Sequence, residues 1–312
     1  MTLETIDLSR LPAPEAIEAL DFETLLAAFK ARFSTSWNAA RAKDPSLPAY
    51  DTIDLETDSA NIAGQAWSWL RLLDRQRVND GLKALLAVLA TKGNLDTVVA
   101  GKNVQRQVII PATGDAAAVM EGDVALLRRY LLAYDLPSSA SAGRYLYDAW
   151  TAWPQSADKT LGLWDARVNG RAVHGRRGDT DVVLIGPGGR LLTSGELATI
   201  RSAVAHPDRT PEAIGLSVMS ASRQEYQVAL TVEVAASGPS PELLKAEAEK
   251  RVIAAATDRI AINGEVPAAL LSGAAYGPGI VKVIDRAPVV VSADPYAVPV
   301  MTSLDIAVEV RS

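Results

Sequence analysis

The sequence predicts an α+β protein with a helical N-terminal region, a mixed central region and a C-terminal region built on β-strands. Apolar residues recur at helical spacing through the first 100 residues, and they alternate at strand spacing beyond residue 226. All six tryptophans lie within the first 164 residues, whereas the C-terminal half is rich in Ala, Val and Ile. A chain of 312 residues is long enough for two or three domains, which we place at 1–100, 101–180 and 181–312.

The composition is that of an ordinary globular protein, with 48% hydrophobic and 22% charged residues. A net charge of −6 argues against a nucleic-acid partner, which needs a basic face. The absence of cysteine excludes disulfides and thiolate chemistry. The N-terminus has no signal-peptide pattern, and the longest apolar run, 84–90, is too short to span a bilayer. We therefore expect no membrane partner and a protein that assembles or acts in a cytoplasm.

The opening segment, residues 6–33, is predicted to be an extended arm followed by an amphipathic helix. Pro12 and Pro14 favour an extended backbone, and Asp21 is placed to cap the helix. The helix carries an apolar stripe formed by Phe22, Leu25, Leu26, Phe29 and Phe33. Because such an arm has no core of its own, we expect it to pack on another surface.

A long helix is predicted from the cap at Asp58 to Lys92, with Gly93 supplying a left-handed stop. Its first apolar stripe consists of Ile62, Ala66, Trp69, Leu70 and Leu73. A second stripe, rotated by roughly 160° from the first, consists of Val78, Leu82, Leu85 and Leu89. A helix buried on two opposite faces needs two partners. Either the helix is kinked or divided into two, each stripe meeting its own domain, or the first stripe makes an intermolecular contact.

The central region is predicted to contain a strand at 108–110 and helices at 121–134 and around Tyr145 and Trp150. The C-terminal region reads as strand 182–185, helix 194–204, strands 214–221 and 226–234, helix 241–260 and strand 279–283. The order β-α-β-β-α-β predicts a ferredoxin-like split βαβ domain. Residues 301–310 are predicted to add an edge strand. This fold carries no function by itself.

No catalytic, cofactor-binding or metal-binding constellation is recognisable in the sequence. His174 and His206 lack further ligands at a useful spacing, so we interpret both as loop or surface residues. The glycine-rich segments at 186–189 and 273–279 match neither a P-loop nor a dinucleotide fingerprint. We interpret the first as a tight strand-to-helix turn. We predict no enzymatic activity and no cofactor.

Two acidic pairs have the residue types used in glycoside hydrolysis, namely Glu121/Asp123 and Asp179/Asp181. We interpret the first pair as helix capping and the second as a solvated turn. Four arginines form a modest basic patch: Arg167, Arg171, Arg176 and Arg177. A solvated loop is the default interpretation of this patch, an acidic protein partner comes second and nucleic acid a distant third.

Several segments, in order along the chain, resemble the baseplate J-like family of wedge proteins from contractile phage tails and tail-derived bacteriocins. They are residues 6–33, 72–101, 121–150 and 278–306, the last of which includes the Pro295-Tyr296 step. The opening string and the RQRVN segment at 75–79 are the most specific. The chain departs from the family pattern at Gly162–Asp179, where we expect an extra charged, glycine-bearing loop.

The resemblance implies a structural wedge subunit in a virion tail baseplate, or in a tail-like particle, assembled in the bacterial host cytoplasm. Two copies would pair with one copy of a smaller tail wedge protein through a three-helix bundle. Their C-terminal domains would join those of neighbouring wedges in a ring around the central hub, which rearranges on contraction. A wedge protein of lysozyme-like fold would link the bundle to the sheath.

Within this scheme, the expected partner-helix interface is the first stripe, namely Ile62, Ala66, Trp69, Leu70 and Leu73. The expected N-terminal docking helix contributes Phe22, Leu25, Leu26 and Phe29. The alternative function is a tail-associated cell-wall hydrolase. A receptor-binding adhesin ranks below both, because the C-terminal half has no tryptophan.

Overall fold

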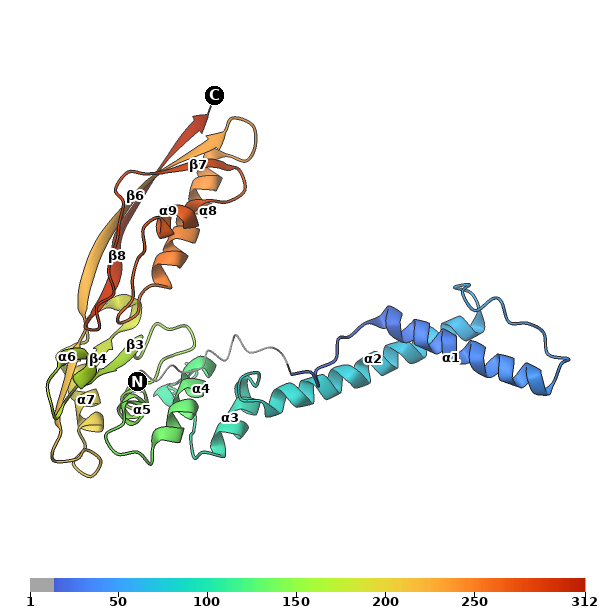
Figure 1. The fold of residues 1–312 in the computed structure, drawn as a ribbon, viewed down its shortest axis with the longest axis horizontal. Coiled ribbons are helices and arrows are strands. Elements are labelled where there is room, and N and C mark those ends of the chain that lie inside the picture. The colour runs from blue at the N-terminus through green and yellow to red at the C-terminus, as the bar shows by residue number, and fades with distance from the viewer. Residues whose placement is uncertain (1–13, 312) are drawn as a thin grey trace. The chain divides into compact units, whose positions relative to one another are not determined.

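The computed structural model describes residues 14–311 and has the predicted α+β composition (Figure 1). The chain forms two compact units that divide between Val98 and Val99. Each unit is described below by itself. The part of the predicted opening arm before Pro14, including Pro12, lies outside the described residues. The division into three domains stays a prediction.

The first unit is built on two long helices, α1 (Phe22–Lys43) and α2 (Ser59–Leu85), which pack side by side (Figure 1). Both predicted caps are present, because Asp21 accepts from the Glu23 N–H and Asp58 accepts from two N–H groups of the first turn of α2. The loop between the helices is held by a cluster of aromatic rings, with neighbouring centroids 4.9–6.5 Å apart: Phe29, Phe33, Trp37, Tyr50 and Trp67.

The predicted continuous helix to Lys92 is wrong, since α2 ends at Leu85. The backbone N–H groups of Leu89 and Ala90 both bond to the Leu86 carbonyl, and this turn buries Ala90. The chain then enters α3 (Lys92–Ala100), so Gly93 lies inside a helix and is not its stop. The apolar run at 84–90 contains no polar residue that would mark a helix end, so it is compatible with a helix or with a packed turn. Burial of Ala90 favours the turn.

The second unit begins with a short ribbon and two helices. The ribbon pairs β1 (Val108–Ile110) with β2 (Val119–Met120). The helices are α4 (Asp123–Leu132), which continues into the 3₁₀ turn η2 (Ala133–Asp135), and α5 (Ala142–Ala152). The strand at 108–110 and both helices agree with the prediction. α5 turns Tyr145, Ala149 and Trp150 inward.

The first three-stranded sheet has the order β3-β4-β5. Its strands are β3 (Asp165–Asn169), β4 (Asp179–Ile185) and β5 (Gly215–Ser220). β4 and β5 are parallel and are connected through η3 (Pro187–Gly189) and α7 (Ser194–Val204), which confirms a tight turn after β4. One face packs against α5 and α7 around buried Val182, Leu184 and Ile200.

The expectation of a loop at 162–179 is wrong, because this segment contains β3 and the single-turn helix α6 (Arg171–His174). β3 pairs residue by residue with β4 from Asp165 opposite Ile185 to Asn169 opposite Asp181. Its sequence, Asp-Ala-Arg-Val-Asn, alternates polar and apolar residues, and Ala166 and Val168 pack against the core. The alternating stretch is only five residues long and is followed directly by Gly170 and Arg171, so it was not recognised as a strand.

The second sheet has the order β7-β6-β8. Its strands are β6 (Ser222–Ala235), β7 (Ile280–Asp285) and β8 (Ala297–Arg311), and β8 is the predicted edge strand. Helices α8 (Pro241–Thr257) and α9 (Leu270–Ala275) cover one face (Figure 1). The core between them includes Leu230, Val232, Ala248, Val252 and Ile306.

The predicted ferredoxin-like split βαβ domain is wrong, although its strands and helices occur in the expected order. That fold needs a hairpin between the strands observed as β5 and β6, but only Ala221 separates them. A hairpin requires a connection of at least two residues, and no Gly, Asn or Pro is present here to form one. The chain therefore passes directly from one sheet into the other, and β8 supplies the parallel partner of β6.

Candidate functional site

The most prominent exposed apolar surface of the first unit is a stripe on α2, which we call the outer seam. It consists of the five predicted interface residues Ile62, Ala66, Trp69, Leu70 and Leu73. All five are exposed, with Trp69 at 57% and Leu70 at 62% of their full accessibility. Residues 62, 66, 69 and 73 follow the four-three-four spacing of a coiled-coil seam. Nothing in the described chain covers this seam, although its spacing is that of a helix-packing face.

The adjacent face of α2, the inner seam, packs against α1. Its buried residues are small or polar: Asn61, Gly64, Ser68 and Asn79. The predicted docking residues Leu25 and Leu26 of α1 are buried here, whereas Phe22 and Phe29 are half-buried. Gly64 permits the close approach, because a Cβ at this position would lie 2.5 Å from Phe29 Cδ1. The four docking residues therefore lie on a helix that packs against α2 of the same chain.

The described end of the N-terminal arm also contacts α2. The buried Asn79 amide accepts from the Glu18 N–H at 3.1 Å and donates to the Glu18 carbonyl at 2.8 Å. Arg75 adds an ion pair with the Glu18 carboxylate at 3.0 Å. These contacts satisfy the backbone of Glu18, which follows a turn closed by the Ile17 N–H and the Pro14 carbonyl; the extended backbone predicted after Pro14 is therefore wrong for residues 14–17. The expectation that the arm packs on another surface therefore holds for Glu18, and that surface belongs to the same chain.

The two sheets of the second unit meet at a joint, which has an apolar centre and a polar margin. Its buried apolar residues come from β4, from the link between β5 and β6, from the segment after α8 and from β8: Val183, Ile185, Ala221, Ile262, Val298 and Val300. Trp164 Nε1 donates to the Ile260 carbonyl at 2.7 Å, and Asn169 Nδ2 donates to the Pro295 carbonyl at 2.7 Å. These hydrogen bonds join residues about a hundred positions apart in sequence, so the tertiary fold alone creates the joint.

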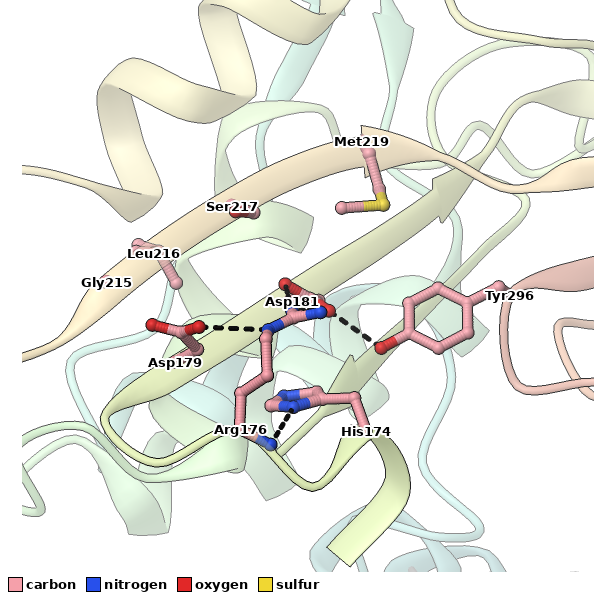
Figure 2. Close-up of a pocket in the computed structure, with 9 residues that line it drawn as sticks. All are labelled: His174, Arg176, Asp179, Asp181, Gly215, Leu216, Ser217, Met219 and Tyr296. Atoms are coloured by element: carbon pink, nitrogen blue, oxygen red, sulfur yellow. Dashed lines mark hydrogen bonds and ion pairs between the residues drawn. The ribbon is translucent and has the colours of Figure 1, made fainter. Parts of the chain in front are cut away.

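A pocket of about 580 Å³ lies at the polar margin of this joint, at the first residues of β4 and β5 (Figure 2). Figure 2 shows Arg176 between the carboxylates of Asp179 and Asp181, with the Tyr296 hydroxyl approaching Asp181 from the opposite side. Arg176 Nη2 lies 2.6 Å and Tyr296 OH 2.7 Å from Asp181 Oδ2. The interpretation of this acidic pair as a solvated turn is therefore wrong for Asp181, which is buried.

The charges in this pocket stabilise one another. Burial opposes ionisation of Asp181, but hydrogen bonds from Tyr296 and Arg176 outweigh it, and the pKa of Asp181 is lowered. The hydrogen bond to Asp181 in turn raises the pKa of Arg176. Burial, followed by the hydrogen bond to Asp181, raises the pKa of the Tyr296 hydroxyl. Arg176, Asp181 and Tyr296, which we call the clasp, therefore form a stable polar contact across the joint. They are not arranged as an acid and a base that exchange a proton.

The other acidic pair is also held by arginines. Glu121 is buried and lies 2.7 Å from Arg129 Nη1, and Asp123 Oδ1 lies 2.6 Å from Arg106 Nη2. The Glu121 carboxylate also accepts from the Gln107 N–H. Burial raises the pKa of Glu121, because lost solvation outweighs the attraction of Arg129. Glu121 is therefore part of a buried ion pair, which corrects its interpretation as a helix cap; the cap position of α4 is Gly122.

The two histidines do not meet. His174 closes α6, is half-buried and accepts from the Arg176 N–H through Nδ1, so it is neither a loop nor a freely exposed residue. His206 is exposed after α7. Among residues 14–311, no group of three His, Asp or Glu side chains is arranged to hold a metal ion. No helix in this range has the length and apolarity to cross a bilayer.

Sequence reasoning missed Asn79 and the clasp around Asp181. One signal was available for the clasp: Asp181 directly precedes four consecutive buried residues of β4, and a carboxylate in that position needs a partner. The partner itself, Tyr296, is 115 residues away and gave no local signal.

Comparison with known proteins places the chain among phage tail baseplate proteins. Residues 56–113, which contain α2 and its outer seam, match the Baseplate J-like N-terminal domain. Over 299 residues the chain is 28% identical to baseplate protein J of Escherichia phage P2, and the alignment covers 91% of this chain and 90% of that protein. These matches confirm the resemblance to the baseplate J-like family that the sequence segments indicated. Homology to a baseplate protein favours a structural, non-enzymatic role.

Proposed function

We propose that the chain is a structural wedge subunit of a contractile-tail baseplate and that it assembles with partner helices through the outer seam of α2. The observation that carries this proposal is the exposure of Trp69, Leu70 and Leu73 on a helix whose other contacts are already made by α1. A helix with a seam-spaced apolar face gains most of its stability by burying that face.

The relation between the two seams supports a bundle rather than a simple pair. Inner-seam residues Asn61 and Ser68 each directly precede an outer-seam residue, Ile62 and Trp69 respectively. One residue corresponds to a rotation of about 100° around the helix, so the two seams face adjacent directions. With α1 on one of them, a helix from another polypeptide fits on the other.

The length of the outer seam limits what it can bind. From Ile62 to Leu73 it spans twelve residues, or about 16 Å, and the next seam positions, Gln76 and Asp80, are polar. The partner we propose is a second copy of this chain together with a smaller tail wedge protein, joined in a three-helix bundle. The C-terminal sheets then contact neighbouring wedges in a ring around the hub, and a wedge protein of lysozyme-like fold connects the bundle to the sheath. This assignment places the working protein in the tail baseplate.

The test is assembly after co-expression with the neighbouring tail gene products. Trp69→Asp and Leu73→Asp are expected to weaken wedge assembly at least about thirtyfold, because a buried interface anchor commonly contributes about 2 kcal/mol or more. Arg71→Asp is the control: it places a negative charge on the same helix, at an exposed residue outside both stripes and roughly 160° from Trp69 and from Leu73. Normal complexes with both seam charges in place, or equal losses with Arg71→Asp, would contradict the proposal.

A further inference from the structure

The exposed edge of β8 is the longest unpaired strand edge in the described part of the second unit. β8 pairs with β6 along one side only, from Ser222 opposite Ala297 to Ala235 opposite Arg311. Figure 1 shows it as the red strand beside β6. Beyond the irregularity at Thr302, the stretch from Ser303 to Arg311 runs for nine residues in regular register. Backbone groups along such an edge are a template for another strand.

Strand edges are usually protected, and β8 lacks several of the usual devices beyond Thr302. The opposite edge of the sheet, β7, has only six residues and carries Lys282 at its middle. From Ser303 onward β8 contains no proline and no lysine. Val310, on the same side of the strand as the core residue Ile306, is 54% exposed. The two edges therefore differ: β7 is short and guarded, whereas β8 is long and open.

We infer that β8 pairs antiparallel with β8 of a second copy across a two-fold axis at Val308, forming a continuous six-stranded sheet. This inference deepens the assembly role proposed above. The register follows from charge. Among the symmetric antiparallel registers, the one centred on Val308 places Asp305 opposite Arg311 at both ends. The register centred on Ala307 instead places Asp305 opposite Glu309 twice, which is repulsive.

The same register also matches the apolar face. It sets Val308 opposite its own copy and Ile306 opposite Val310, so the exposed Val310 side chain gains an apolar neighbour. On the solvent face Ala307 lies opposite Glu309. Asp305 already contacts Arg286 at 2.6 Å, and this ion pair holds its carboxylate on the solvent face where Arg311 of the copy would lie. A strand pair of this length is a small interface, so we expect it to act together with the helical contacts.

The cysteine-free sequence permits a direct test by disulfide trapping of the purified full chain. Directly opposed residues of antiparallel strands have Cα atoms about 4.5–5.5 Å apart, within disulfide range. Val308→Cys alone is expected to form a covalent dimer under mild oxidation. A mixture of Ala307→Cys and Glu309→Cys chains is expected to cross-link, whereas Ala307→Cys alone is not.

Three results would overturn the inference. Val308→Cys could remain monomeric, Ala307→Cys alone could cross-link most efficiently, or Lys282→Cys mixed with Val308→Cys could cross-link, which would indicate β7-to-β8 pairing. Charge provides the second readout. Arg311→Glu is expected to lower dimer affinity about tenfold, from two lost attractions and two new repulsions, and Asp305→Arg combined with Arg311→Glu to restore it. Glu309→Lys is the control and should change little; a clear strengthening of the dimer would indicate the register centred on Ala307.

The outcome is separable from the proposed function. Val308→Cys is tested again in the Trp69→Asp background, where the strand disulfide should persist although helical assembly is lost. Loss of the disulfide in an otherwise assembling chain would refute the strand pairing and leave the helical seam intact.

Discussion

Gly64 gives the sharpest test of how α1 packs on α2. A Cβ at this position would lie 2.5 Å from Phe29 Cδ1 and 3.3 Å from Leu26 Cδ1. The Phe29 ring has little freedom to move, because it contacts Phe33 and Trp67 at centroid distances of 6.5 and 5.6 Å. Gly64→Ala therefore overpacks the inner seam, at a typical cost of about 1–3 kcal/mol.

Alanine also favours the helix by about 0.8–1.0 kcal/mol relative to glycine, so the net loss at Gly64 is about 0–2 kcal/mol. Gly81, in the same helix, supplies a matched control, because a Cβ added there would meet no heavy atom within 4 Å. Gly81→Ala should stabilise the unit by up to about 1 kcal/mol. The free energies of unfolding of the two variants are thus expected to differ by about 1–3 kcal/mol. At the upper end of this range, Gly64→Ala destabilises the unit and Gly81→Ala stabilises it.

The measurement is urea unfolding of the full chain, followed by circular dichroism and by tryptophan fluorescence. Trp37, Trp67 and Trp69 all report on the first unit. Because the chain has two compact units, the transition of the first unit is fitted separately. Equal stabilisation by Gly64→Ala and Gly81→Ala would refute the close approach of α1 to Gly64.

Three further predictions concern the second unit. Glu121→Gln should destabilise it by about 3–5 kcal/mol in urea unfolding, since Arg129 is left buried without its partner, while Glu121→Gln with Arg129→Met should recover much of the loss. The Arg190 hydrogen bonds lower the pKa of Glu196 to about 2, from an ordinary value of 4.5. The stability that this contact contributes is therefore complete above pH 4.5 and is lost as the pH falls towards 2. Glu196→Gln should flatten the acid-unfolding curve between these pH values. An unchanged curve would contradict the prediction. Tyr296→Phe should cost about 1.5–3 kcal/mol at the joint and speed hydrogen exchange near Asn169 and Asp181, whereas Tyr276→Phe, at an exposed tyrosine, should leave exchange at these residues unchanged.

The two long helices could be predicted because their signals are local, whereas their packing against each other within one chain was not predicted. Asp21 and Asp58 were identified as caps from their position before apolar stripes, and both cap in the structure. The exposure of the outer seam also follows from residue spacing. The outer seam and the inner seam lie on different faces of α2, and α1 covers only the inner seam. The end of α2 at Leu85 was not predictable in this way, since it depends on burying Ala90 in a turn.

The two C-terminal sheets show where sequence reasoning stops. Strands and helices from β4 to β7 were predicted in the correct order, but strand order along a chain does not specify which strands pair. β3 was missed because its alternating pattern is only five residues long and lies in a segment rich in charged and glycine residues. The clasp of Arg176, Asp181 and Tyr296 was missed because its members come from distant segments.

The sequence by itself determined the resemblance to the baseplate J-like family, the caps and stripes of the two long helices, and the alternation of the strands, because each of these depends on neighbours within a few turns or residues. Only the tertiary structure decided that the C-terminal strands form two sheets, that Glu121 and Asp181 are buried beside arginines, and that β8 keeps an open edge. The physical reason is that pairing and burial depend on contacts between residues tens to hundreds of positions apart, where many arrangements are compatible with the same local pattern.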